Sequence, residues 1–137
     1  MEVFKSDYRS AEGVEGIDLS YCILGREGPE PEAAFMMGTG AVADWEDGHE
    51  WRALRNKRYT YAIYRVDSKE FLFDNIEDPY QMKNLAEDPY YKEILEYFRS
   101  LLKRKMEELG NRFEASTWYR DNWTKDRIIL RTATLKG

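Results

Sequence analysis

Apolar residues between positions 89 and 109 recur every three or four residues, which is the spacing of one helix face. They are Tyr91, Ile94, Leu95, Phe98, Leu101, Leu102, Met106 and Leu109. Charged side chains fill the positions between them. Asp88 is a suitable N-cap, Pro89 suits the first helical position, and Gly110 suits the residue after the last turn. The pattern predicts a long amphipathic helix that covers an apolar surface.

Shorter segments upstream have the composition and the period of two that are typical of β-strands. Residues 58 to 66 alternate tyrosine and isoleucine with a second row of side chains. The predicted strands are residues 33 to 37, 51 to 56, 58 to 66 and 70 to 74, with a hairpin turn at 67 to 69. Together with the helix they predict an α+β fold, in which a small antiparallel β-sheet of about four strands packs against the long C-terminal helix.

The tetrapeptide Glu-Asp-Pro-Tyr occurs twice, at residues 77 to 80 and 87 to 90. An aspartate followed by proline is a signature of a helix start, because the carboxylate accepts a free N–H and proline has none to lose. The second copy begins the long helix. The first copy predicts a short helical turn over residues 79 to 84.

We interpret residues 1 to 137 as a single domain in three parts. Residues 1 to 32 form a linker-like arm rich in glycine and proline, and residues 33 to 109 form the sheet and the helix. Residues 110 to 137 form a tail in which Trp118, Tyr119 and Trp123 are apolar anchors. A last strand is expected within residues 127 to 135.

Composition narrows the class of protein. Of the 137 residues, 42% are hydrophobic, so the chain is apolar enough to fold as one domain. The net charge of -5 argues against a nucleic-acid partner. No apolar stretch approaches the roughly 20 residues of a membrane span. The N-terminus lacks the apolar region of a signal peptide, which leaves the compartment open. Cys22 is the only cysteine, so no internal disulfide can form.

Candidate chemistry is concentrated in residues 38 to 52. His49 is the only histidine, and it is either a surface group beside carboxylates or a substrate contact at the edge of a site. Trp45, Trp51 and Arg52 suit sugars and anionic groups. Alternatively, Trp51 belongs to a strand core and Trp45 folds the loop down. The acidic residues 44 to 47 lack the spacing of a calcium loop, and no Cys/His set indicates a metal site.

Two segments carry a family resemblance. RALRNKRYTYAIYR (52 to 65) and KEFLFDNIEDPYQMKNLAEDP (69 to 89), followed by a long helix, resemble the C-terminal part of type I sulfatases. Gln81 stands where that family often has glutamate. Upstream, residues 12 to 25 resemble the segment that leads into the same subdomain, so the resemblance covers about residues 13 to 109. The family pattern is filled by Arg52, Arg55, Arg58, Tyr59, Tyr61, Glu70, Phe71, Phe73, Asp74, Asp78, Pro79, Asn84 and Leu85.

The resemblance also implies where the catalytic groups of the family lie. Sulfatases cleave sulfate esters with a formylglycine made from Cys or Ser in a Cys-x-Pro/Ala-x-Arg motif, assisted by a divalent cation, usually Ca²⁺. The resemblance places both in a large N-terminal α/β domain. Cys22 and Arg26 have the motif's spacing, but Leu24 replaces Pro or Ala. We therefore predict no catalytic residue, metal ligand or cofactor in this chain, and no activity by the chain alone.

Three hypotheses follow. In the first, the chain is an accessory subdomain that packs on a sulfatase catalytic domain, in cis or in trans. Loop 38 to 52 would then help shape the pocket for a sulfated carbohydrate or aryl sulfate through Trp45, His49 and Arg52. An apolar face would be left uncovered, or buried by homo-oligomerisation. In the second, the chain is a free-standing module that binds carbohydrate or another sulfated ligand. In the third, it is a half-enzyme completed by a separate chain.

Overall fold

The computed structural model describes residues 17, 19–39, 47–125 and 128–129. The chain divides into two compact units, Met1–Pro31 and Glu32–Gly137, which are described separately. In the first unit a single helical turn, α1 (Ser20–Ile23), ends at Gly25, whose φ of 62° lies in the left-handed region. The Tyr21 hydroxyl donates a hydrogen bond of 2.6 Å to a backbone carbonyl eight residues later, which folds this part of the arm on itself.

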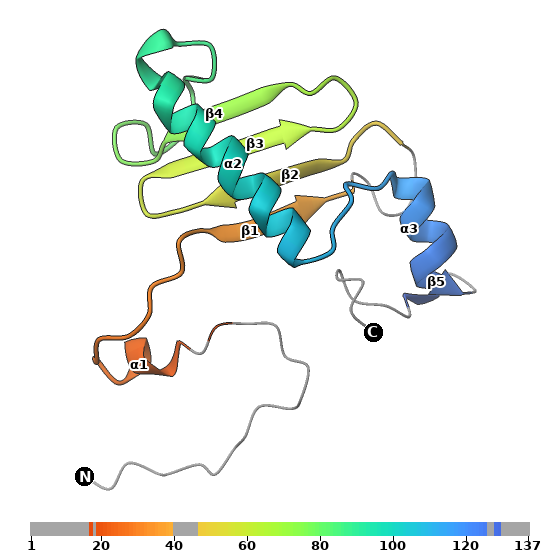
Figure 1. The fold of residues 1–137 in the computed structure, drawn as a ribbon, viewed down its shortest axis with the longest axis horizontal. Helices are drawn as coiled ribbons and strands as arrows, with labels where there is room; N and C mark the ends of the chain where they lie inside the picture. Colours follow the sequence, from red (N-terminus) through yellow and green to blue (C-terminus); the bar gives the residue numbers. More distant parts are fainter. Residues whose placement is uncertain (1–16, 18, 40–46, 126–127, 130–137) are drawn as a thin grey trace, which may run out of the picture. The chain divides into compact units, whose positions relative to one another are not determined.

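The second unit is built on a four-stranded antiparallel sheet whose strands follow one another in chain order (Figure 1). The strands are β1 (Ala34–Gly38), β2 (Trp51–Arg55), β3 (Tyr59–Tyr64) and β4 (Glu70–Asp74). Helix α2 (Lys92–Glu108) crosses one face of the sheet. The predicted α+β fold is confirmed, and each strand agrees with its predicted range to within two residues.

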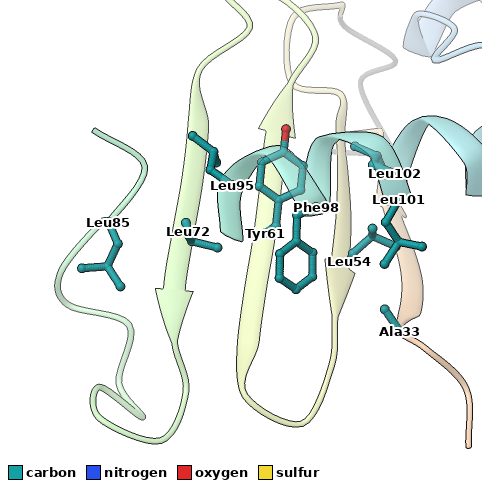
Figure 2. Close-up of a cluster of buried hydrophobic side chains, with 9 residues drawn as sticks. All are labelled: Ala33, Leu54, Tyr61, Leu72, Leu85, Leu95, Phe98, Leu101 and Leu102. Atoms are coloured by element: carbon teal, nitrogen blue, oxygen red, sulfur yellow. The ribbon is translucent and has the colours of Figure 1, made fainter. Parts of the chain in front are cut away.

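The core lies between α2 and one face of the sheet. The pairing register places Leu54, Tyr61 and Leu72 side by side across β2, β3 and β4. Figure 2 shows that the side chains of Leu95, Phe98, Leu101 and Leu102 from α2 meet this row. Burying a side chain of this size stabilises the fold by about 1.5–3 kcal/mol. The sheet and the helix therefore depend on each other for their apolar burial.

The signals at both ends of the long helix act as predicted. The Asp88 carboxylate accepts the N–H of Tyr90 at 3.0 Å, and a 3₁₀ turn, η1 (Pro89–Tyr91), leads into α2. At the far end Gly110 has a φ of 62°. Its N–H and that of Asn111 donate to carbonyls of the last helical turn, which is the Schellman arrangement. Local capping thus sets the length of α2.

The first copy of the tetrapeptide does not begin a helix, so the helical turn predicted over residues 79 to 84 is wrong. The carboxylate of Asp78 instead accepts the N–H of Lys83 at 2.8 Å. Gln81 has a φ of 56°, a left-handed conformation that interrupts a right-handed helix. The segment forms a turn that brings the next residues back to the sheet.

Asn84 fastens that returning segment to the free edge of β4. Its side-chain oxygen accepts the N–H groups of Leu72 at 2.9 Å and Ala86 at 3.1 Å, and its amide donates to the Glu70 carbonyl at 3.0 Å. The Leu85 N–H donates to the Leu72 carbonyl, and the Leu85 side chain enters the core. The Asn84 side chain therefore satisfies backbone groups of β4 that a neighbouring strand would otherwise pair.

We predict that Asn84→Ala destabilises the second unit by about 1–3 kcal/mol, because the N–H groups of Leu72 and Ala86 and the Glu70 carbonyl lose their side-chain partner. The check is urea denaturation together with hydrogen exchange of the Leu72 amide. Glu87→Ala, a truncation at an exposed position in the same segment, is the control and should leave both unchanged. An unaltered Leu72 amide in Asn84→Ala would contradict this account of the edge.

The tail contains a helix that the pattern analysis did not predict, α3 (Ser116–Trp123). It is followed by a two-residue strand, β5 (Thr124–Lys125), which pairs with β6 (Ile128–Ile129). The predicted last strand, 127 to 135, is represented by β6, and its remaining positions lie outside the described residues. No helix in the described ranges is long and apolar enough to cross a membrane.

Candidate functional site

Two segments far apart in sequence meet beside the β1–β2 end of the sheet. One is the end of the loop that enters β2, and the other is the tail from Asn111 through α3. We call the residues that join them the loop–tail cluster: Asp47, Glu50, Arg52, Asn111, Ser116, Thr117 and Tyr119. This cluster includes Asp47 and Glu50, the two carboxylates in the described part of the loop, and one predicted site residue, Arg52.

Two carboxylates of the loop cap the start of α3. Glu50 is fully buried, and its carboxylate accepts the Ser116 N–H at 2.6 Å and the Gly48 N–H at 3.0 Å. Asp47 accepts the N–H of Thr117 at 2.9 Å and its hydroxyl at 3.0 Å. The first turn of a helix has N–H groups without intrahelical partners and a positive dipole end, so carboxylates stabilise it. The loop thereby sets where α3 begins.

Arg52 joins β2 to the tail from inside the unit. Its side chain is fully buried, and Nε donates to the Asn111 side-chain oxygen at 2.9 Å. The two terminal nitrogens donate to the Trp51 carbonyl at 2.9 Å and to the Tyr119 hydroxyl at 2.6 Å. The guanidinium lies 4.5 Å from the ring centroid of Phe113. These contacts hold the tail against the end of β2.

The two buried charges lie close enough to influence each other. Burial by itself would raise the pKa of Glu50, but hydrogen bonds from backbone N–H groups, that of Ser116 foremost, outweigh it and lower the pKa. Burial lowers the pKa of Arg52, against the opposing effects of Tyr119 and Glu50. The carboxylate therefore stays charged because it is bonded to backbone N–H groups.

The three residues predicted to contact substrate have different positions. His49 is exposed, and it lies between the two capping carboxylates along the chain. Arg52 is buried, with its guanidinium directed to acceptors in the protein. Trp45 lies outside the described residues. A substrate contact by any of the three stays a prediction.

The sequence did not indicate that tail residues bond to Glu50 and Arg52. Tyr119 was recognised as an apolar anchor, but its hydroxyl contact with Arg52 spans 67 residues and has no local signal. Ser116 meets Glu50 across 66 residues. The one available hint was the pair of carboxylates in the loop, which is the type of side chain that caps a helix.

The face of the sheet opposite α2 is a second candidate surface. It is a shallow trough of about 430 Å³. Small side chains, Ala53 and Ala62, form its centre. Aromatic rings pack along one side, with Phe71 5.9 Å from Tyr64 and 6.1 Å from Phe73 between centroids. The complete lining is Met36, Trp51, Ala53, Arg55, Thr60, Ala62, Tyr64, Phe71, Phe73 and Gln81.

Gly38 is needed for the shape of this face. It pairs with Trp51 across β1 and β2, and a Cβ atom at Gly38 would lie 2.3 Å from the indole nitrogen. No real Cβ makes so close a contact, so only glycine lets the indole lie across the edge strand. Trp51 therefore lies on the trough face, not in the core beneath α2.

Two carboxylates of the family pattern, Glu70 and Asp74, are engaged within the unit. Glu70 accepts the Tyr61 hydroxyl at 2.6 Å and forms an ion pair with Arg99. Asp74 forms a 2.9 Å ion pair with Arg58. Within the described ranges, no three His, Cys, Asp or Glu side chains converge as metal ligands. Glu70 and Asp74 therefore act within the fold, through their ion pairs with Arg99 and Arg58.

Comparisons with known proteins agree with this architecture. No protein-family model matches the chain. An ulvan-active sulfatase of Formosa agariphila is 34% identical over 117 residues, covering 83% of this chain and 22% of that protein. A Δ4,5-hexuronate-2-O-sulfatase of Bacteroides thetaiotaomicron is 39% identical over 66 residues, covering 44% of this chain and 14% of its own length. The chain corresponds to the C-terminal subdomain of sulfatases.

A solved structure of a 2-O GAG sulfatase shares the fold of this subdomain. It superposes with a TM-score of 0.68 at 23% identity, over 92% of this chain and 28% of that one. The subdomain thus spans about a fifth or less of the length of the curated relatives named above. The partial coverage agrees with an accessory part of a sulfatase.

We predict that Tyr119→Phe weakens the docking of the tail by about 1–3 kcal/mol, because it leaves a buried guanidinium N–H of Arg52 without an acceptor. Urea denaturation followed by tryptophan fluorescence measures this effect, since α3 carries Trp118 and Trp123. Tyr90→Phe makes the same chemical change at an exposed position and should have no effect. Equal stability of the two variants would contradict the assigned role of the hydroxyl.

Acid should release α3 through Glu50. Its pKa in the folded state is below the ordinary value of 4.5, so the stability it contributes is present above that value. That stability is lost as the pH falls through the lower folded pKa. Arg52 and Glu114 are charged groups of the same surroundings. Glu50→Gln removes this titration and is the comparison.

The measurement is hydrogen exchange of the Ser116 amide, which is bonded to Glu50, from about pH 6 down to about pH 3, corrected for intrinsic exchange. We expect its protection to fall at the acid end in the wild type. In Glu50→Gln it should already be reduced at pH 6 and should depend less on pH. Identical profiles would show that Glu50 does not hold α3.

Proposed function

We propose that this chain is an accessory C-terminal subdomain of a sulfatase, a sulfuric ester hydrolase. Through the trough face, which is the face of the sheet opposite α2, it packs on a catalytic α/β domain that is supplied in cis or in trans. Through its loop it helps to shape the substrate pocket. The catalytic domain brings the formylglycine and the metal ion. The substrate is a sulfated carbohydrate or an aryl sulfate.

The trough face carries this proposal. A sheet that meets water on one side normally alternates apolar and polar residues, with the polar ones outward. Here the outward row of β4 is Phe71 and Phe73, and the neighbouring strands add Tyr64 and Trp51. A contiguous apolar patch of this kind marks an interaction surface. In the curated relatives most of the chain lies outside the matching segment, which makes that remainder the natural occupant.

The loop gives the proposal its link to substrate. His49 is exposed beside the β1–β2 end of the sheet, and the part of the loop before it contains Trp45, which is outside the described residues. Arg52 supports this region from within. The relatives are named as an ulvan-active sulfatase, a Δ4,5-hexuronate-2-O-sulfatase and an endo-4-O-sulfatase. The ulvan and hexuronate in the first two names favour a sulfated sugar as substrate.

The experiment supplies the catalytic domain as a separate chain. The probe is the Formosa agariphila ulvan-active sulfatase without the segment that matches this chain, and the reporter is 4-nitrophenyl sulfate. We expect hydrolysis and a one-to-one complex on mixing with this chain, and no hydrolysis by this chain alone. Ala62→Arg puts a charge at the centre of the trough and should abolish both. Ser100→Arg, at an exposed position on α2, should abolish neither.

Other outcomes assign other functions. Hydrolysis by the pure chain would overturn the accessory role. Binding of a sulfated glycan by the chain, lost in Trp45→Ala and without complex formation, would favour the alternative of a free-standing carbohydrate-binding module. A dimer that dissociates in Ala62→Arg would identify a second copy of the chain as the occupant of the trough. Circular dichroism of both arginine variants verifies that each is folded.

A further inference from the structure

We propose that helix α3 is the positioning element of His49, and that Thr117 and Ser116 act as its positioning residues. This inference rests on the proposed function, in which His49 lies at the edge of a substrate pocket. It assigns a role to the tail that goes beyond packing. The tail would determine the position of the His49 imidazole at the surface of the loop.

Contacts with α3 hold the two ends of a short stretch of backbone that contains His49. Asp47 is bonded to the backbone and the hydroxyl of Thr117. Three residues later, Glu50 is bonded to the backbone of Ser116. Two consecutive residues of α3 therefore hold both ends of residues 47 to 50. His49 is the exposed residue inside this short bridge.

Glu50 connects this bridge rigidly to the sheet. Its backbone carbonyl accepts the N–H of Arg65 at 2.9 Å, while its side chain accepts the N–H of Ser116. The Ser116 hydroxyl also donates to the carbonyl of Thr39, at the other end of the same loop. Both ends of the loop thus converge on one residue of α3. A buried residue with several satisfied partners has few alternative positions.

Gly48 allows the tight path between the two carboxylates. Its φ of 101° is accessible to glycine and strained for other residues. Its N–H donates to the Glu50 carboxylate, which closes the bridge on itself. Since Gly48 is conformationally free in an untethered chain, the contacts with α3 supply the restraint on His49.

The test uses Thr117→Val, which keeps the shape of the side chain and removes the hydroxyl bond to Asp47. Thr117→Ser restores that hydroxyl and is the rescue variant. Ser116→Ala removes the bond to Thr39, and Ser100→Ala makes the same change at an exposed position of α2. The first readout is the imidazole proton resonance of His49 in the chain alone, which is unambiguous because the chain has one histidine.

We expect the His49 resonance to shift or broaden in Thr117→Val and in Ser116→Ala, and to match the wild type in Thr117→Ser and Ser100→Ala. In the sulfatase assembled in trans, KM for a sulfated oligosaccharide should rise about 2- to 10-fold in Thr117→Val, as expected for one lost hydrogen bond. The kcat for 4-nitrophenyl sulfate should not change. A purely structural defect would lower kcat for both substrates.

The two proposals fail in different ways. An unchanged His49 resonance in both Thr117→Val and Ser116→Ala overturns the positioning role, whatever the assembled enzyme does. A shifted resonance with unchanged KM in an active assembly overturns the connection to substrate. If the wild-type chain gives no activity with the catalytic part, the proposed function fails, and the resonance alone then decides whether α3 positions His49.

Discussion

One helix can cover only one face of a four-stranded sheet, and this constraint determines which face of the sheet α2 buries and which it leaves uncovered. Helix α2 has 17 residues and buries its apolar stripe on the row formed by Leu54, Tyr61 and Leu72. The opposite face has aromatic rings in its lining and, within the described part of the second unit, no second layer. Most two-layer folds turn polar side chains outward at such a face. The second unit therefore has one face of its sheet buried under α2 and an apolar lining on the other face.

The residues behind the family resemblance act on this architecture. Asn84 and Leu85 fasten a turn to the edge of β4, and Glu70 accepts a hydrogen bond from Tyr61 beneath α2. Each satisfies backbone or side-chain groups that would otherwise lack partners. Similarity in this segment therefore identifies a structural lobe and not a reaction. In the proposed function, the chemistry is supplied by the catalytic domain on which this lobe packs.

Much of the fold could be predicted because its signals are local. The period of the α2 stripe and its caps at Asp88 and Gly110 are encoded within one segment, as are the alternating strands. The first Asp-Pro pair has the same local signal as the second, but pairing of the following residues with β4 prevailed over it. Helix α3 has only eight residues, and Glu50, which caps it, lies 66 residues from Ser116. A short helix held by distant contacts has no periodic signature to detect.

Arg52 shows why the site was harder to predict than the fold. A guanidinium near tryptophans suggests an anion or sugar contact when only neighbouring residues are known. In the folded chain the tail covers it, and Asn111, Tyr119 and Phe113 occupy its hydrogen-bonding groups and its face. Its charge then stabilises the same end of the sheet that presents His49. In the proposed function, Arg52 supports His49 from the interior, through the contacts that hold the tail against β2.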